Sequence, residues 1–191
     1  MLFLAIVLGD ISGIRKTGIL VPCLVCKGVD VTTFYNNASI REVLLGINVS
    51  RATAVPPTAL QSPQTLFTIT GGRILLVHLL GEVTTVIGGN AQTLKVSSLS
   101  SAAGSASLDL CTVSGSIATH PVGTHYALPN AVGSALADDH ATLSGMEVAA
   151  GPRIILPAGV ITLTSSATNT GSIKWDIIYI PLDTGSLVVA A

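Results

Sequence analysis

The fold class is decided by residues 63–96, PQTLFTITGGRILLVHLLGEVTTVIGGNAQTLKV. In its first part apolar residues alternate with threonines, the period of two that is typical of a strand with one buried face. Glycines at 71–72, 81 and 88–89 interrupt the apolar runs, and the two doublets suit turns that need positive φ. The stretch predicts four short strands joined as a β-meander.

The segment 73–80 is unusual because it is apolar on both sides. Strict alternation divides its apolar side chains into two sets, one for each face: Ile74, Leu76 and Leu80 against Leu75, Val77 and Leu79. A strand of this kind is covered on both faces. The second cover is either the opposite sheet of the same domain or a neighbouring subunit. We therefore predict interface residues in and just after this strand, namely Arg73, Ile74, Leu75, Leu76, Val77, Leu79, Val83 and Val86.

The composition favours a subunit of a larger assembly. At 191 residues the chain suffices for one compact domain with an extension, or for two small domains. Hydrophobic residues make up 49% and charged residues only 10%, against about 25% charged residues in a typical soluble domain. A membrane protein is the competing explanation. The longest apolar runs, 2–8 and 74–80, fall short of the roughly 20 residues of a spanning helix, which favours the assembly.

Charge and cysteine content argue against a nucleic-acid-binding protein and against a disulfide-rich secreted protein. The formal net charge is −1 and the basic residues are scattered, so no nucleic-acid partner is expected. The opening residues, MLFLAIVL, lack the basic segment and the small-residue cleavage site of a signal peptide. Three cysteines, Cys23, Cys26 and Cys111, are too few for a disulfide framework and fit a protein made in a reducing cytoplasm.

Residues 1–62 carry no long apolar period and are predicted to form an extended N-terminal arm and linker. Short strands are expected at 1–8 and 29–35. A helical turn is expected at 39–45, where an S-x-x-E pattern provides a capping box. We predict that this arm gains order by lying along a partner, and that residues 63–191 form the folded oligomerisation domain.

Short strands are predicted through the rest of the chain. After residue 96 they are expected at 107–113, 123–128, 153–156, 160–164 and 172–182, while 141–148 is either a strand or a loop. Roughly eight to ten short strands without long helical patterns predict an all-β domain, an antiparallel β-sandwich or a jelly-roll-like barrel. Trp175 falls on the inward face of the last long strand and is expected in the core.

The motifs able to carry chemistry are weak. Cys23 and Cys26 form a CxxC pair, but zinc or redox chemistry needs partners that the sequence does not place nearby. His120 and His125 share a loop and no helical face. Residues 138–140, Asp-Asp-His, would bind a divalent ion only if further oxygens converged on them. We expect no catalytic residue, no cofactor and no metal site.

Four segments resemble small β-rich virion proteins encoded among the structural genes of tailed bacteriophages. They are LFTITGG (66–72), LLGEVTTVI (79–87), SLDLCTV (107–113) and GVITLTSSATNTGSIKWDIIYIPLDTGSLVVAA (159–191). The resemblance covers about residues 62–191 and is most specific at 81–85 and 171–183. It implies a particle-surface protein, commonly a homotrimer, of the capsid decoration or cement, head-fibre, tail or baseplate type. It implies no enzyme activity.

Three hypotheses follow for the function. The first is a homotrimeric capsid decoration (cement) protein, made in the host bacterial cytoplasm and located on the virion, whose arm contacts the major capsid protein. The second is a tail, fibre or baseplate component of the same particle. The third is a β-sandwich enzyme or carbohydrate-binding module, which requires a metal site, exposed aromatic side chains, or convergent acids such as Asp109, Asp176 and Glu82 in one cleft. No membrane partner is expected.

Overall fold

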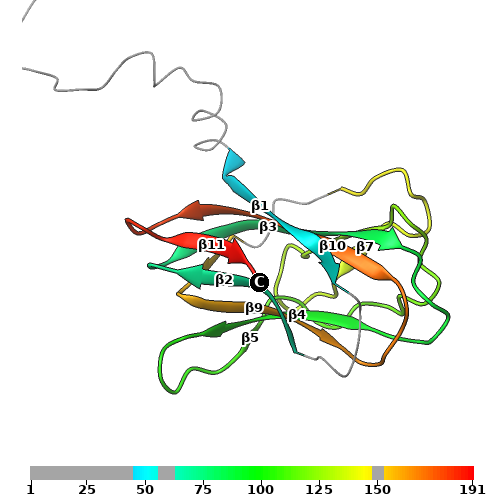
Figure 1. The fold of residues 1–191 in the computed structure, drawn as a ribbon, viewed down its shortest axis with the longest axis horizontal. Helices are drawn as coiled ribbons and strands as arrows, with labels where there is room; N and C mark the ends of the chain where they lie inside the picture. The colour runs from blue at the N-terminus through cyan, green and yellow to red at the C-terminus, as the bar shows by residue number, and fades with distance from the viewer. Residues whose placement is uncertain (1–44, 56–62, 148–152) are drawn as a thin grey trace, which may run out of the picture.

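The computed structural model describes residues 45–55, 63–147 and 153–191, and these residues form a two-layered β-sandwich (Figure 1). Neighbouring strands run antiparallel in both layers. The predicted all-β fold class is confirmed. Within the described part of the chain, no helix has the length and apolar character needed to span a membrane.

One layer, called sheet A, has six strands in the order β1-β10-β3-β6-β7, with β8 paired to β3. These strands are β1 (Ile47–Val55), β3 (Ile74–Thr85), β6 (His125–Ala127), β7 (Ala137–Asp138), β8 (Ile154–Leu156) and β10 (Ser172–Pro181). The other layer, sheet B, has five strands in the order β11-β2-β9-β4-β5. These are β2 (Gln64–Thr70), β4 (Leu94–Ser100), β5 (Leu108–Asp109), β9 (Gly159–Ser165) and β11 (Leu187–Ala190).

Residues 63–96 form three strands, and these strands do not pair with one another. β2 and β4 flank β9 in sheet B, whereas β3 crosses to sheet A, so the predicted meander is wrong. β3 also continues through Gly81, a predicted break. Gly81 lies opposite Trp175, and a Cβ atom at this position would approach the indole ring to 3.0 Å. The glycine therefore makes room for a core side chain instead of ending a strand.

A β-bulge at Val77 changes which side chains of β3 face the core. Two consecutive residues of β10 pair with Leu76 and His78, so Val77 is the extra residue. Beyond the bulge Leu79 points into the core and is fully buried, whereas Leu80 turns to the outer face and is half-buried. The predicted alternation is wrong beyond Val77, because one inserted residue exchanges the two faces of a strand.

The core lies between the two sheets and takes side chains from both. Trp175 on β10 is fully buried, as the alternation of β10 predicts. β9 shows the same period-two burial in sheet B. The largest fully buried side chains are Trp175, Tyr126, Tyr179, Phe67, Leu66, Ile69, Ile74, Leu76, Leu79, Ile87, Leu94 and Leu110. Burial between two sheets is the main stabilising contribution to such a fold.

The folded domain begins before the predicted boundary at residue 63. β1 is an edge strand of sheet A and pairs with β10. Ile47 and Val49 pack against the core, and the Arg51 guanidinium donates a 2.7 Å hydrogen bond to the backbone carbonyl of Thr65 on β2. The strand β1 therefore belongs to the sandwich and not to the arm.

The other predicted elements vary in outcome. Strands are found close to the positions predicted for β8, β9 and β10, whereas the strands predicted at 107–113 and 123–128 shrink to β5 and β6. Residues 141–147 form no strand. The strands, the helical turn and the CxxC pair predicted before β1 lie outside the described residues.

Two tight corners of the sandwich interlock where β2 turns into β3 and β10 turns into β11. Arg73 donates to the Asp183 carboxylate from its backbone N–H, from Nε and from Nη2, at 2.7 to 2.9 Å. The backbone N–H of Leu182 donates to the Arg73 carbonyl at 3.0 Å. These bonds tie the first corner to the second. Arg73 thus has a role within the monomer.

We expect the Asp183 contact to make stability depend on acid pH. Hydrogen bonds from the Arg73 side chain and backbone lower the pKa of Asp183 to about 2. An unfolded aspartate has a pKa of about 3.9. The stabilisation by the Arg73–Asp183 contact is therefore complete above that pH and is lost as the pH falls towards about 2. Asp183→Asn should lower the urea midpoint at pH 5. Between pH 4 and pH 2 the midpoint of this variant should fall less than that of the wild type. Glu82→Gln, which removes an exposed carboxylate elsewhere, is the control; equal profiles for both variants would contradict this expectation.

Candidate functional site

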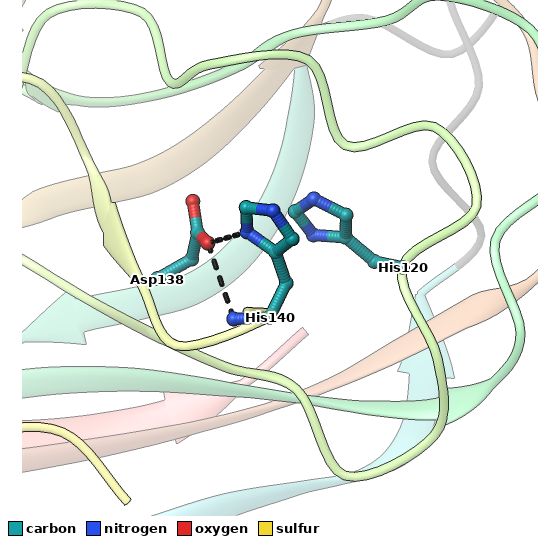
Figure 2. A group of neighbouring side chains, drawn as sticks. All are labelled: His120, Asp138 and His140. Atoms are coloured by element: carbon teal, nitrogen blue, oxygen red, sulfur yellow. Dashed lines mark hydrogen bonds and ion pairs between the residues drawn. The ribbon is translucent and has the colours of Figure 1, made fainter. Parts of the chain in front are cut away.

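At the β7 edge of sheet A, the loop before β6, the end of β7 and the turn after it bring His120, Asp138 and His140 together (Figure 2). One candidate ligand atom from each residue lies within 4.8 Å of the other two. Asp138 Oδ1 accepts from the backbone N–H of His140 and contacts His140 Nδ1. The His120 imidazole stacks on that of His140, with ring centroids 4.1 Å apart and ring planes 13° apart. We call these three residues the His–Asp–His cluster.

His120 is held rigidly from behind. Its backbone carbonyl accepts from the Ile87 N–H at 3.1 Å, which fastens the loop to the residue that follows β3. Its Nδ1 lies 2.7 Å from the Tyr126 hydroxyl. The residue is buried. A ring fixed in this way is a preorganised part of the cluster.

Asp138 and His140 are positioned by the short pairing of β6 with β7. Asp138 lies opposite Tyr126 in that ladder. The next residue, Asp139, is buried and accepts from the His125 backbone N–H at 2.6 Å, while its second oxygen lies 2.9 Å from His125 Nδ1. The turn that follows Asp139 places the His140 side chain over His120. His140 remains half-exposed.

The cluster connects to the core through a column of aromatic rings. His140 stacks on His120, His120 lies 5.9 Å from Tyr126, and Tyr126 lies 6.4 Å from Trp175, measured between ring centroids. The interplanar angles do not exceed 25°. Trp175 is the only tryptophan of the chain. Changes at the cluster can therefore be followed by the fluorescence of one indole.

Burial keeps the inner part of the cluster uncharged. The pKa of His120 is lowered by burial and by the neighbouring His140 imidazole, against the opposing effect of the Asp138 carboxylate. The pKa of Tyr126 is raised by burial and by the two carboxylates of Asp138 and Asp139. Neutral imidazole is the form that binds metal ions, so His120 is available as a donor at neutral pH.

The sequence gives little warning of this cluster. His120 and His140 are separated by a loop, by β6 and by β7, and no spacing rule joins them. His125, five residues after His120 in the sequence, is not part of the cluster and binds Asp139. The Asp-Asp-His triplet at 138–140 is the only signal in the sequence. It does not reveal His120, because the pairing of β6 with β7 is what brings that imidazole to the triplet.

The predicted interface residues fall into two groups. Ile74, Leu76, Leu79 and Val83 have an exposed fraction of zero and lie in the core, so their side chains are not available to a partner in this fold. The others face outward: Leu75 and Val77 are half-buried, Arg73 binds Asp183, and Val86 is 54% exposed. The cover on the inner face of β3 is the opposite sheet of the same domain.

The outer face of sheet A carries a row of aliphatic side chains across three strands. Ile155 on β8 lies opposite Leu75 on β3, which in turn lies opposite Ile180 on β10. Their neighbours along β3 and β10 point into the core, so these three point outward. Ile155 is 57% exposed, and the other two are half-buried. We call these residues the outer apolar row.

The three acids of the enzyme hypothesis do not share a cleft. Glu82 and Asp176 point outward from sheet A, where Glu82 lies opposite Lys174 and Asp176 accepts from the Ser50 hydroxyl. Asp109 belongs to sheet B, where it binds Ser97 and Lys95. Because the sheets form the two layers of the sandwich, these carboxylates cannot act together on one substrate.

Comparisons with known proteins identify no relative. No protein-family model, no curated protein and no solved structure matches the chain. The resemblance to phage virion proteins therefore stays a prediction.

Proposed function

We propose that this chain is a structural protein of a tailed-bacteriophage particle, a homotrimeric decoration (cement) protein that stabilises the head shell. The observation that carries the proposal is the outer apolar row on sheet A. Three adjacent aliphatic side chains on a pleated surface form a contiguous patch with the character of a subunit interface. The particle type and the trimeric state come from the sequence resemblance.

The chemistry of the surface supports self-association. Only 10% of the residues are charged, and other aliphatic side chains, including Leu182 and Val86, are also largely exposed. Burying apolar area contributes about 25 cal/mol per Å², so several such side chains per subunit stabilise a closed oligomer. Interfaces between obligate partners resemble a domain core cut in half, and the row has that composition.

The arm supplies the second element of the proposal. Residues 1–44 precede the sandwich and would contact the shell, with the trimer presenting three copies at once. Three modest contacts made by one trimer give tight attachment, because each later contact forms at a high effective concentration. A cement protein requires this combination of self-association and shell contact.

The trimer is expected to depend on the outer apolar row. Ile155→Lys should weaken self-association by roughly 100-fold or more, because an unpaired ammonium group buried in an interface costs several kcal/mol. Ile155 is 57% exposed in the monomer, so the same change should leave the sandwich folded. Sedimentation velocity between 1 and 50 µM measures the mass of wild type and variant.

Thr84→Lys is the matched control, since Thr84 is exposed on the outer face of the same sheet, beyond the row, and the variant gains the same charge. It should remain trimeric. A wild-type protein that is monomeric throughout the concentration range, or an Ile155→Lys variant as trimeric as the control, would exclude the proposed surface.

Binding to particles distinguishes the two virion roles. A fluorescently labelled full-length protein added to purified heads should bind in hundreds of copies, and a variant lacking residues 1–44 should not bind. A few copies per particle located at the tail would favour the tail, fibre or baseplate alternative. If the protein binds neither heads nor tails, the result would count against both virion roles.

A further inference from the structure

We propose that His120, Asp138 and His140 form a binding site for one divalent transition-metal ion of the zinc class. Two imidazoles and one carboxylate are donors that zinc and its neighbours in the first transition row accept readily. Magnesium and calcium prefer sites made of oxygen donors alone. A three-donor protein site completes its coordination with water.

The distances require only a small rearrangement. The candidate donor atoms already lie within 4.8 Å of one another. Metal–donor bonds of about 2.0–2.2 Å place neighbouring donors of a tetrahedral zinc ion roughly 3.5 Å apart. The most distant donors must therefore approach by about 1 Å, while Asp138 and the His140 ring, which are hydrogen-bonded, must separate to the same spacing. Both changes fall within the motion of an exposed side chain.

One imidazole must also turn. The two rings are nearly parallel and stacked, so the lone pairs of their nitrogens lie in two separate planes and cannot both point at one ion. His120 is buried and fixed by the Tyr126 hydroxyl, a contact of the kind that orients metal-binding histidines. His140 is 49% exposed, so its ring can turn towards the ion once its hydrogen bond to Asp138 is released. Figure 2 shows its ring between Asp138, to which it is hydrogen-bonded, and the His120 ring.

An ion bound at the cluster would cross-link two loops at one end of the sandwich. Between residues 101 and 147 the described strands are β5, β6 and β7, which have only two or three residues each. Outside these short ladders the loops are attached to the rest of the sandwich by individual backbone hydrogen bonds, such as those from the Ile117 N–H to the Gln92 carbonyl and from the Ile87 N–H to the His120 carbonyl. An ion shared by His120 and His140 would join the loop before β6 to the loop after β7, and so would close this end of the sandwich.

The test uses the full-length chain with Cys23→Ser and Cys26→Ser, so that the CxxC pair cannot bind the probe. We expect one Zn²⁺ per chain by isothermal titration at pH 7.5, with a dissociation constant on the order of 10 µM. Zn²⁺ at 100-fold excess over this constant should raise Tm by about 5 °C or more, and Mg²⁺ should not. Cu²⁺ should quench Trp175 fluorescence, and Zn²⁺ should relieve the quenching by competition.

His140→Ala and His125→Ala form a matched pair of variants. Both histidines are about half-exposed and both contact an aspartate, but only His140 lies beside a second imidazole. His140→Ala should weaken Zn²⁺ binding at least 30-fold, while His125→Ala should change it less than threefold. Absence of a Tm shift in the starting protein, equal losses in the two variants, or unchanged binding in His140→Ala would each overturn the proposal.

Discussion

Removal of residues 1–62 is expected to abolish cooperative unfolding, whereas removal of residues 1–44 is expected to preserve it. The difference between the two truncations is the strand β1 and the linker after it. β1 pairs with β10, the strand that carries Trp175 through the centre of sheet A. Without β1, β10 becomes an unprotected edge, and such edges promote aggregation.

The expected loss is large compared with the net stability of a domain. Ile47 and Val49 are partly buried and each contributes about 1 kcal/mol, less than a fully buried side chain, and each ladder hydrogen bond contributes about 1 kcal/mol. Their sum, on the order of 5 kcal/mol or more, is comparable with a typical stability of 5–15 kcal/mol. The lost hydrogen bond from Arg51 to Thr65 adds to it.

Thermal unfolding followed by circular dichroism, with urea titration, measures both truncated proteins. The shorter truncation should show one cooperative transition and the longer one should show none, or should aggregate. If both unfold at temperatures within a few degrees of each other, β1 does not belong to the cooperative unit. The outcome also decides which truncation is suitable for particle-binding experiments.

The second large effect is expected at Gly71, in the corner that joins β2 to β3. Its φ is +74°, and a Cβ atom there would lie 2.8 Å from the carbonyl carbon of Gly185 and closer still to the oxygen. Both are backbone atoms of the neighbouring corner, which the Arg73–Asp183 contacts hold in place. Gly71→Ala should therefore cost about 3 kcal/mol or more, because the clash is added to the backbone strain.

Gly104 provides a control with nearly the same backbone conformation. Its φ is +75°, and an added Cβ atom would meet nothing within 4 Å. Gly104→Ala therefore carries the strain of a left-handed residue alone, about 1–2 kcal/mol. Urea midpoints for the two variants isolate the steric contribution at Gly71. Equal midpoints would show that the two corners separate without cost.

Much of the fold is predictable from residues 63–96 and 159–182, because each strand there is long enough for burial to impose a period of two. β9 and β10 alternate as their sequences indicate. The prediction fails at Val77 and Gly81, where a bulge and a close approach to Trp175 interrupt the local pattern. Both failures depend on the strand that lies alongside, and β10 is about 100 residues away in the chain.

The candidate site could hardly be predicted from the sequence, for the same reason. His120 and His140 belong to loops whose sequences carry no period, and their stacking depends on how β6 pairs with β7 and on the hydroxyl of Tyr126. The outer apolar row was partly foreseen. Leu75 was among the predicted interface residues, but its neighbours Ile155 and Ile180 are adjacent only through the sheet register.

An all-β chain with little charge and an inward-facing Trp175 follows from the residues alone, because composition and a period of two are local properties of strands. The division of residues 63–96 between two sheets, the place of β1 in the sandwich and the side chains of β3 that remain outside all depend on the three-dimensional packing. The same packing also assembles the His–Asp–His cluster. These features follow from contacts between distant segments, whose register is set by packing in the shared core and not by any short stretch of residues.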